Sequence, residues 1–366
     1  MDSKVNFFDY DRTSLEKFLL SLGEPSFRSR QILQWVYHRG VVDISEMTNL
    51  SLDLRYRLND LVSFELPVIV EEKRSIDGTR KWLMKLSDGK NIEMVLIPAD
   101  NRMTLCVSSQ VGCALKCAFC ATGQQGFSRN LTSSEIIGQV WLAERMLKDT
   151  NQQAGKITNV VMMGMGEPLL NYSAVLTAIK TMVDDLSFGL SRRRVTLSTA
   201  GIVPGIDRLA EDCPVSLAIS LHASDDALRS RLVPLNKKYS ISMLLDACRR
   251  YVRYDSRGAV TFEYIMLNGV NDSPSQAHQL RALLADLPAK VNLIPYNNVA
   301  DTGFKSSSVE TIEKFRTILN GAGIMTVTRK TRGSDIDAAC GQLASKAFNQ
   351  DSHFEGAGTS GDGAIQ

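Results

Sequence analysis

The sequence predicts an α/β protein whose core is a partial barrel of six strand–helix units. From Thr104 onward, short apolar runs alternate with segments of helical spacing, and the apolar runs are almost uninterrupted. Strands that are apolar along their whole length are typical of a parallel sheet with helices on its faces. Such barrels carry their chemistry on the loops at the carboxyl ends of the strands, so we expect the site there.

Two other patterns precede the barrel. Residues 14–61 have apolar positions at helical spacing, and residues 68–98 change to a period of two, with Asp-Gly turn signals between strand-like runs. We therefore expect a small helical domain over residues 1–65, which would be an accessory domain, and a linking β-meander over residues 66–98.

The barrel core is expected over residues 99–345, including a C-terminal extension. The strand candidates are residues 104–108, 157–163, 195–199, 215–221, 260–266 and 291–295, with a further run at 325–329. The helix candidates are residues 134–148, 173–183, 205–210, 225–231, 243–251, 275–287 and 308–320. The Thr132-x-x-Glu135 pattern at the first of these helices is typical of a capping box. Residues 346–366 are rich in Gly and Ser and are expected to be disordered.

Composition restricts the class of protein. With 44% hydrophobic and 22% charged residues, the chain is ordinary for a soluble globular protein. No run approaches the roughly 18 apolar residues that a membrane span needs, and the first residues lack the apolar stretch of a signal peptide. Seven cysteines without an export signal indicate the reducing cytoplasm, where clustered cysteines more often serve metal binding or catalysis than disulfides. A net charge of +2 does not by itself indicate a nucleic-acid partner.

Three cysteines, Cys113, Cys117 and Cys120, form a C-x3-C-x2-C motif just after the first barrel strand. Structural zinc sites and ordinary iron–sulfur sites use four protein ligands. Three thiolates would instead leave one iron of a 4Fe–4S cube open to a small molecule. This spacing is that of the radical S-adenosylmethionine (SAM) enzymes, whose open iron chelates the amino and carboxylate groups of SAM. A zinc site completed by a distant residue is the alternative, although four histidines leave few partners.

Polar residues at later strand ends would face the same mouth of the barrel. Gly166 and Glu167 follow the second strand, in a G-x-G-E-P stretch like the one that meets the ammonium group of SAM in radical SAM enzymes. A mere tight turn is the alternative for this stretch, and an ordinary turn residue is the alternative for each of the others. Together they would suit the ribose, adenine and carboxylate of SAM. These other candidates are Ser198, Ser220, Leu221, His222 and Asn297.

Three further residues receive only structural interpretations from the patterns alone. Cys106 lies in the first barrel strand and Cys340 lies after the last one. A free cysteine is commonly a small buried hydrophobe. Glu93 alternates with apolar Ile92 and Met94, which predicts an exposed strand residue.

Arginines gather in three segments. Solvated faces explain most such runs, and phosphate-binding patches are the functional alternative. Tyrosines within the second segment add possible base stacking. The segments are residues 192–194, 249–257 and 329–332.

Four segments together resemble the RlmN family, radical SAM enzymes that methylate carbon 2 of adenine in ribosomal and transfer RNA. They are residues 106–125, 162–171, 193–199 and 329–343. The resemblance covers roughly residues 10–345, and the N-terminal part is similar to that family's small RNA-binding accessory domain.

The resemblance implies roles for the three residues left as structural. Cys340 would accept a methyl group from one SAM, and a second SAM would yield a 5′-deoxyadenosyl radical that takes a hydrogen atom from that methyl group. The resulting methylene radical would add to adenine carbon 2. Cys106 would help to resolve the protein–RNA adduct by a transient disulfide with Cys340, and Glu93 would be the proton acceptor. Lys330 and Arg332 could assist the thiolate of Cys340.

The resemblance also implies the partners. These are a 4Fe–4S cluster, two SAM molecules per turnover, an electron donor such as flavodoxin, a 23S rRNA adenosine in the peptidyl transferase centre and the tRNA adenosine 3′ to the anticodon. We expect a monomer and no membrane partner. One alternative is methylation of carbon 8 of the same ribosomal adenine, as in the antibiotic-resistance relatives, and another is a non-enzymatic iron–sulfur RNA-binding protein. One departure is Asn298, which follows Asn297 where the family often has proline.

Overall fold

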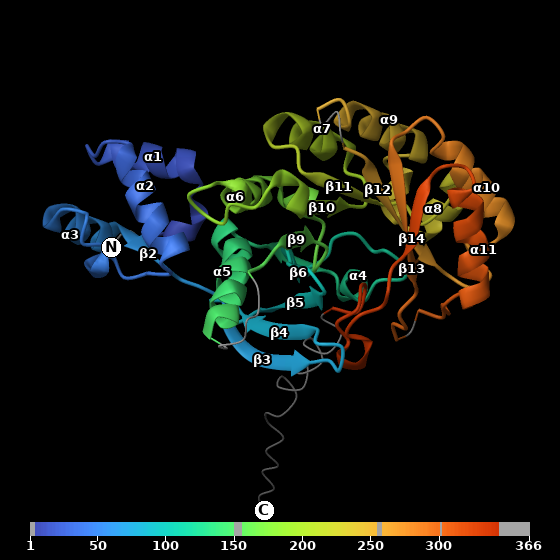
Figure 1. The fold of residues 1–366 in the computed structure, drawn as a ribbon, viewed down its shortest axis with the longest axis horizontal. Helices are drawn as coiled ribbons and strands as arrows, with labels where there is room; N and C mark the ends of the chain where they lie inside the picture. Colours follow the sequence, from blue (N-terminus) through green and yellow to red (C-terminus); the bar gives the residue numbers. More distant parts are fainter. Residues whose placement is uncertain (1–3, 150–155, 255–257, 301, 344–366) are drawn as a thin grey trace, which may run out of the picture.

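The computed structural model describes residues 4–149, 156–254, 258–300 and 302–343, and the tail predicted to be disordered lies outside these residues. The predicted α/β class is confirmed. The described residues form a sheet of ten strands in the order β14-β13-β12-β11-β10-β9-β6-β5-β4-β3 (Figure 1). Its two end strands, β14 and β3, do not pair with each other within this part of the chain, so the barrel stays open.

The barrel proper consists of the parallel strands and the helices between them, which lie on its outer side (Figure 1). The strands are β6 (Arg102–Cys106), β9 (Asn159–Met162), β10 (Val195–Thr199), β11 (Ser216–Ser220), β12 (Val260–Met266), β13 (Ala289–Pro295) and β14 (Met325–Thr328). The helices are α4 (Ala121–Gln125), α5 (Ser133–Asp149), α6 (Tyr172–Val183), α7 (Val203–Asp212), α8 (Asp226–Leu232), α9 (Ile241–Tyr251), α10 (Pro274–Leu283) and α11 (Val309–Asn320). Each strand candidate of the sequence thus corresponds to a strand, and the short helix α4 is an addition.

The β-meander is part of the same sheet. Its strands β3 (Val68–Arg74), β4 (Arg80–Lys85) and β5 (Asn91–Ala99) are antiparallel, and β5 also pairs with β6. The sequence predicted only a linking segment here. Residues 92–96 of β5 are all buried, because this strand lies between two neighbours and is covered on both faces. The expectation that Glu93 is exposed is therefore wrong, since Glu93 is 4% exposed.

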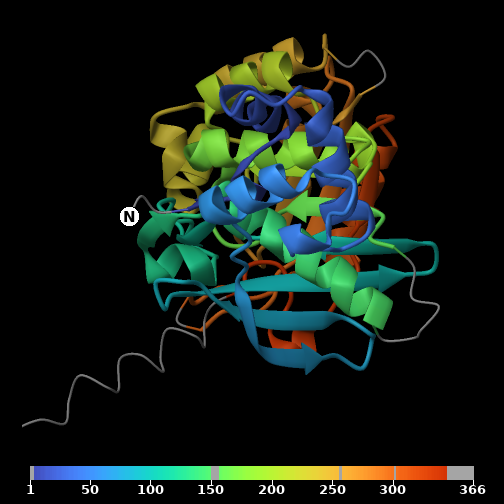
Figure 2. The ribbon, with the colours of Figure 1, turned by 90° about the vertical axis from the view of Figure 1, so that its left-hand side faces the viewer.

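The N-terminal helices pack against the barrel through a small aromatic cluster. They are α1 (Arg12–Ser21), α2 (Phe27–Leu33) and α3 (Leu52–Leu61), joined by a two-stranded pair, β1 (Val5–Asn6) and β2 (Val62–Ser63), that the sequence did not predict. Phe8 meets Trp141 of α5 edge-on, with ring centroids 6.0 Å apart, and Tyr37 meets Phe188 at 5.0 Å. Figure 2 shows these helices in front of the barrel helices and above the meander.

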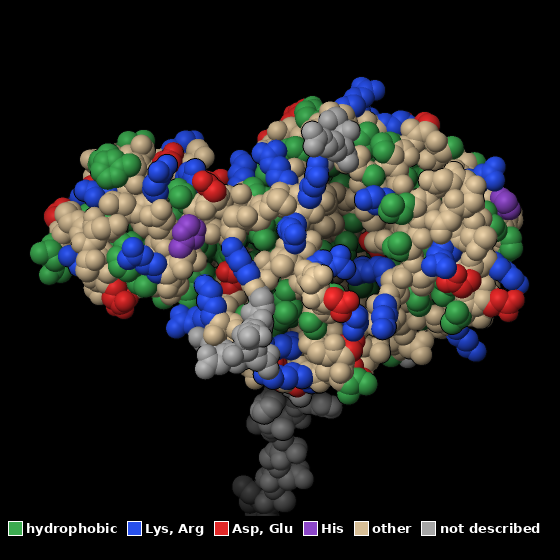
Figure 3. Space-filling view, in the orientation of Figure 1, with side chains coloured by type: hydrophobic (Ala, Val, Ile, Leu, Met, Phe, Trp, Pro, Cys, Tyr) green, Lys and Arg blue, Asp and Glu red, His purple; other side chains and the backbone are tan. Residues whose placement is uncertain are grey.

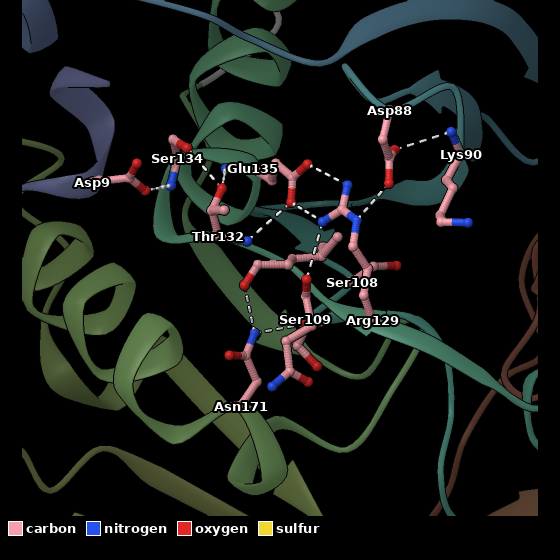
Figure 4. A network of polar contacts seen from close by, with 12 residues as sticks. Asp9, Asp88, Lys90, Ser108, Ser109, Arg129, Thr132, Ser134, Glu135 and Asn171 are labelled. Atoms are coloured by element: carbon pink, nitrogen blue, oxygen red, sulfur yellow. Dashed lines mark hydrogen bonds and ion pairs between the residues drawn. The ribbon is translucent and has the colours of Figure 1, made fainter. Parts of the chain in front are cut away.

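A polar network ties the meander and the N-terminal helices to the start of α5 (Figure 4). The two Nη atoms of Arg129 donate to the Glu135 carboxylate at 2.8 Å, and its Nε donates to Asp88 at 2.7 Å. The Thr132 backbone N–H donates to Glu135 at 2.9 Å, and the Thr132 hydroxyl accepts the Glu135 N–H, so the capping box is confirmed. A backbone N–H at the start of α5 donates to Asp9 at 2.7 Å.

The remaining elements are short. A hairpin of β7 (Gln110–Gly112) and β8 (Phe127–Asn130) flanks the cysteine motif. Single turns of helix are η1 (Phe7–Asp9), η2 (Gln34–His38), η3 (Ile44–Glu46), η4 (Pro168–Asn171), η5 (Arg192–Arg194), η6 (Pro234–Lys237) and η7 (Ser334–Ile336). No helix in the described part of the chain combines the length and apolar character that crossing a membrane requires.

Candidate active site

A cavity opens at the carboxyl ends of the barrel strands, where the fold class places the chemistry. Nine of the predicted site residues line it: Cys113, Cys117, Cys120, Gly166, Glu167, Ser198, Ser220, His222 and Cys340. The other four, which are Glu93, Cys106, Leu221 and Asn297, lie behind or beside its wall.

The cysteine motif occupies a loop that the β7–β8 hairpin closes at its base. The Cys113 N–H donates to the Gly126 carbonyl at 2.9 Å, and the Cys120 N–H donates to the Cys117 carbonyl at 3.2 Å. Gly112 has φ +73°, and a Cβ at this position would lie 1.9 Å from the Gly126 carbonyl oxygen. Only glycine fits there, so this residue is needed to bring the three cysteines into one loop.

The three cysteines lie on one loop and line one cavity. An iron–sulfur cube would take each of the three thiolates at a different iron. Burial raises the pKa of the Cys113 thiol to about 12 and that of Cys117 well above its usual range. Iron coordination would supply the positive charge that makes these buried thiolates favourable.

The Gly-Glu-Pro stretch forms the cavity wall beside this loop. Gly166 has φ +97°, and a Cβ there would lie 2.4 Å from Gln110, so the close approach requires glycine. Glu167 is 4% exposed, and its two carboxylate oxygens accept the backbone N–H groups of Ala200 at 2.8 Å and Leu169 at 3.1 Å. Burial raises the pKa of Glu167 to about 6, although these hydrogen bonds oppose the rise. The stretch is thus both a tight turn and part of the site.

His222 joins the cysteine loop to the opposite wall. Its ring meets Phe119 edge-on, with centroids 4.7 Å apart, and its Nδ1 accepts the Ile265 N–H at 3.1 Å. The backbone adopts φ +62°, which is unusual for a residue with a side chain and is typical of functional sites. Burial lowers the pKa of His222 to about 3, so the imidazole is neutral near pH 7.

Two predicted SAM contacts lie away from the cavity surface. The side chain of Leu221 is fully buried, its N–H donates to the backbone carbonyl of Glu263 at 3.1 Å, and its carbonyl accepts from Arg229 at 3.1 Å. The Asn297 amide donates to the Cys340 carbonyl at 3.3 Å. The contacts of Leu221 and Asn297 with SAM therefore stay predictions.

Cys340 is exposed and belongs to a loop that the barrel holds from one side. The Ala121 N–H donates to the Gly341 carbonyl at 2.9 Å, and the Thr122 hydroxyl donates to the Leu343 carbonyl at 3.2 Å. The Gln342 amide donates to the carbonyl of Asn298, the residue that departs from the family pattern, at 3.1 Å. These bonds place Cys340 at the mouth of the cavity that the three cysteines line.

The meander holds the same loop from the other side. The Ser75 hydroxyl donates to Asp335 at 2.6 Å, and the Gly333 N–H donates to Asp77 at 3.1 Å. Lys81 Nζ donates to the Asp337 carbonyl at 3.1 Å. Residues 333–343, which we call the carrier loop, are thus held between the meander and the barrel.

Glu93 lies beneath this loop in a buried ion pair. Its Oε1 is 3.0 Å from Lys81 Nζ, and the two side chains are only 6% and 7% exposed. The pairing explains how β5 tolerates a carboxylate at a buried position, because a buried charge requires a partner. Glu93 reaches the carrier loop through Lys81 and does not line the cavity.

Arg329 is a site residue that the sequence did not reveal. It lines the cavity, its Nη1 lies 3.7 Å from Glu263 Oε2, and the same atom contacts the Met163 sulfur at 3.9 Å. The charge of the Cys340 thiolate raises the pKa of Arg329, and Glu263 and Cys106 act in the same direction. The residues expected to assist Cys340 were Lys330 and Arg332, whereas Arg329 is the basic residue of this run that lines the cavity with Cys340. Its position directly after β14 was the one signal available, because strand ends face the cavity.

Cys106 and Arg332 complete this part of the site. Cys106 ends β6 and is 8% exposed, and burial raises its pKa to about 12, with a further rise from the Cys340 charge. Both thiols are free. Arg332 instead faces the meander, with its Nη1 3.8 Å from Asp77.

The structure describes residues 249–254 of the second arginine segment, where the exposed Tyr254 stays a candidate for base stacking. Arg249 and Arg250 pair with nearby aspartates at 2.6–3.1 Å. Tyr251 is 4% exposed and donates its hydroxyl to the Val215 carbonyl at 2.8 Å, so it offers no ring for base stacking. The interpretation of Tyr251 as a stacking platform is wrong.

Comparisons with known proteins agree with this geometry. Residues 5–63 match a family described as the ribosomal RNA large subunit methyltransferase N-terminal domain, and residues 107–280 match the radical SAM superfamily. A crystal structure of a radical SAM methyltransferase from Sphaerobacter thermophilus is 44% identical, with a TM-score of 0.86, and the match covers 93% of this chain and all of that one. The chain belongs to the RlmN family.

More distant structures are less similar. A domain of the pyruvate-formate lyase-activating enzyme from Bacteroides vulgatus is 20% identical, with a TM-score of 0.37, over 47% of this chain and 99% of that one. Streptococcus suis SuiB bound to SAM is 13% identical, with a TM-score of 0.45, over 63% of this chain and 52% of that one. As an RlmN-family member, the protein is a radical SAM methyltransferase that uses a 4Fe–4S cluster and SAM. The non-enzymatic interpretation is therefore wrong.

Proposed function

We propose that the enzyme methylates carbon 2 of adenine in RNA through a methyl group carried on Cys340. One observation carries this proposal: an exposed cysteine on the carrier loop faces the cavity that the three-cysteine motif lines. Carbon 2 of adenine is electrophilic and does not react with an ordinary methyl donor. A carbon radical positioned on a protein thioether is a chemically suitable alternative.

Different residues of the chain would bind the cluster, bind SAM and accept the methyl group. When bound, the cluster and SAM supply the methyl group and the radical chemistry. Cys113, Cys117 and Cys120 would hold the cluster, and the Gly166–Glu167 wall, with Ser198, Ser220 and His222, would hold SAM. The Cys340 sulfur is the nucleophile that accepts the methyl group, and Arg329 lines the same cavity as the nearby cation.

Two further residues would complete turnover. Glu93, held by Lys81 beneath the carrier loop, is our proposed proton acceptor from carbon 2. Cys106 interacts electrostatically with Cys340, which supports its proposed role in resolving the adduct through a transient disulfide. In that step the Cys106 thiolate attacks the Cys340 sulfur and forms the disulfide, the carbon–sulfur bond to the RNA breaks, and its electron pair takes up a proton to complete the methyl group. A two-electron reductant, such as a cellular dithiol, would then return both cysteines to thiols.

The proposed substrates are 23S rRNA and tRNA. The N-terminal helices match a domain named for ribosomal RNA methyltransferases. Figure 3 shows Lys and Arg side chains gathered over the middle of one face, between these helices and the strands β13 and β14. Residues 192–194 are exposed, and no ion pair of the described residues includes them. Arg194 donates to the Thr158 carbonyl and to Asn159 at 3.4 Å, whereas Arg192 and Arg193 are our proposed phosphate contacts. We further propose a cytoplasmic monomer that receives electrons from a flavodoxin-like donor.

Nucleoside mass spectrometry tests this function. Anaerobically reconstituted enzyme, SAM and a reductant are incubated with unmodified rRNA and tRNA. We expect 2-methyladenosine. An 8-methyladenosine product would assign the enzyme to the carbon-8 alternative, and SAM cleavage without methylated RNA would reject the RNA substrate.

A second experiment tests the carrier. Peptide mass spectrometry of protein matured with cluster and SAM should find a methyl group on Cys340. Cys340→Ala should abolish RNA methylation, whereas the matched variant Cys213→Ala, at a buried cysteine of the core, should retain it. A free Cys340 thiol in matured, active protein would contradict the proposal.

A further inference from the structure

Arg229 of α8 is fully buried, at 0% exposure, behind the cavity wall. A charged side chain is almost never fully buried unless it is paired. Among the ion pairs of the described residues, none includes Arg229. The positive charge of this guanidinium therefore lacks the carboxylate partner that would ordinarily compensate it.

The hydrogen bonds of Arg229 all go to neutral oxygens. Its Nη2 donates to the carbonyls of Ala200 at 2.7 Å and Ser220 at 3.1 Å, and its Nε donates to the Leu221 carbonyl at 3.1 Å. Its Nη1 donates to Asn236 at 2.8 Å. These bonds tie together the ends of β10 and β11, but they leave the net charge in place. They also leave Arg229 unavailable to a ligand in the cavity.

The helix that carries Arg229 packs directly against the cysteine loop. The Ala118 N–H, between two of the cysteines, donates to the Leu232 carbonyl of α8 at 3.0 Å. Phe119 of the loop shares an apolar cluster with Leu228 and Leu232. Burial lowers the pKa of Arg229 to about 10, and the charge of Cys117 is the largest influence that opposes this shift. The contacts of α8 thus place Arg229 on the helix that packs against the cysteine loop, and Cys117 of that loop acts on it more strongly than Asp226 does.

We propose that Arg229 is the buried counter-charge of the cysteine-ligated cluster and makes its reduction potential less negative. Three thiolates surround the cluster, and reduction adds one more negative charge. A fixed positive charge at a buried position stabilises the reduced form more than the oxidised form, because the low dielectric screens it little. Burial and nearby charge are known determinants of iron–sulfur potentials. Arg229 is a positioning residue in this scheme, because it acts through the cysteine loop and contacts neither cluster nor substrate.

Potentiometry on the full-length, reconstituted protein tests the proposal. A dithionite titration with redox mediators, without SAM, is followed by the electron paramagnetic resonance signal of the reduced cluster. Arg229→Gln removes the charge, and we expect the ratio of reduced to oxidised cluster at a fixed potential to fall about tenfold, which is about 59 mV for one electron. Arg229→Lys keeps the charge and loses most of the hydrogen bonds, so its potential should stay near that of the parent.

Two further variants distinguish an effect of charge near the cluster from a structural effect of replacing Arg229. Asp226 is exposed and its charge acts on Arg229, so Asp226→Asn should shift the potential in the opposite direction, by less because water screens the charge. The asparagine side chain introduced by this substitution can still accept the Ile241 N–H, as Asp226 does at 2.8 Å, so the variant should fold. Arg250→Gln, at an exposed arginine of α9, is the matched control and should not change the potential.

Equal shifts in the Gln and Lys variants of Arg229, or no shift in either, would overturn the proposal and leave Arg229 as a structural clamp. If the Arg229 variants do not bind iron, Asp226→Asn decides: an unchanged or more negative potential refutes the counter-charge. These outcomes do not depend on RNA methylation, so they are independent of the proposed substrate.

Discussion

The buried pair of Lys81 and Glu93 leads to a quantitative stability prediction. The two charged atoms are 3.0 Å apart, and both side chains are less than 10% exposed. Lys81→Met removes the cation and leaves the Glu93 carboxylate buried without its lysine partner. Removing one member of a buried ion pair typically costs about 3–5 kcal/mol. We expect the free energy of unfolding to fall by that amount. The substitution also removes the hydrogen bond from Lys81 to the carrier loop, which acts in the same direction.

The chain offers a matched control for this substitution. Lys314 and Glu310 form an ion pair of 2.7 Å on α11, but their side chains are 65% and 76% exposed. Lys314→Met should cost no more than about 0.5 kcal/mol, since water screens an exposed helical pair. Both variants are compared by urea unfolding of the metal-free protein, followed by circular dichroism, so that cluster binding does not add to the stability of one of them.

A double substitution separates the pair from the packing. Lys81→Met combined with Glu93→Leu removes both charges, and the double variant should be more stable than Lys81→Met alone, because no uncompensated charge remains. A cost below about 1 kcal/mol for Lys81→Met would mean that water reaches Glu93 and that the pair behaves as a surface pair. The proposed role of Lys81 in holding the proton acceptor would then be refuted.

Three further predictions concern the cavity. Gly166→Ala should weaken SAM binding, measured by calorimetry, because the position has φ +97° and lacks space for a Cβ; unchanged affinity would show that the wall adapts. Arg329→Gln should slow methylation of Cys340, followed by peptide mass spectrometry, because it removes the cation that lines the cavity with Cys340, whereas Arg332→Gln, which faces the meander, should not. The folded-state pKa of His222 is lowered to about 3, whereas the unfolded-state pKa is near 6.5. The contribution of the neutral imidazole to the free energy of unfolding is therefore complete above pH 6.5 and is lost as the pH falls below 6.5. His222→Gln should reduce the slope of stability between pH 6.5 and 4.5 by up to about 1.4 kcal/mol per pH unit, and an unchanged slope would contradict a neutral, buried imidazole.

The sequence predicted those parts of the fold that depend on residues close together along the chain. The strands of the barrel are apolar along their length, and strand ends of a parallel sheet meet at one edge. For that reason Ser198, Ser220 and His222 could be placed at one cavity without any knowledge of their contacts. The spacing of the three cysteines similarly indicated an iron–sulfur site without any knowledge of the fold. The capping box at Thr132 and Glu135 was predictable because its two hydrogen bonds are local.

The errors concern contacts between distant parts of the chain. Glu93 alternates with apolar neighbours as an exposed residue would, but it is buried because β5 lies between two other strands of the sheet, and it pairs there with Lys81. Lys81 in turn contacts the carrier loop across 256 residues of sequence. Arg329 stands in a basic run and resembles a phosphate contact. Its role depends on Cys106 and Glu263, which lie on other strands. Sequence periodicity does not show which side chains of other strands such a residue meets across a sheet.

The carrier loop is anchored to both the meander and the barrel, so its position depends on these two parts forming one sheet. Asp335 is bonded to the turn at Ser75 at one end of the loop, and Gly341 is bonded to Ala121 beside the cysteine motif at the other. Cys340 lies next to the second anchor and is exposed. If the meander were a separate linker, the first anchor would move relative to the cysteine motif. Pairing of β5 with β6 fixes that distance, and with it the position of the loop that carries Cys340, our proposed methyl carrier.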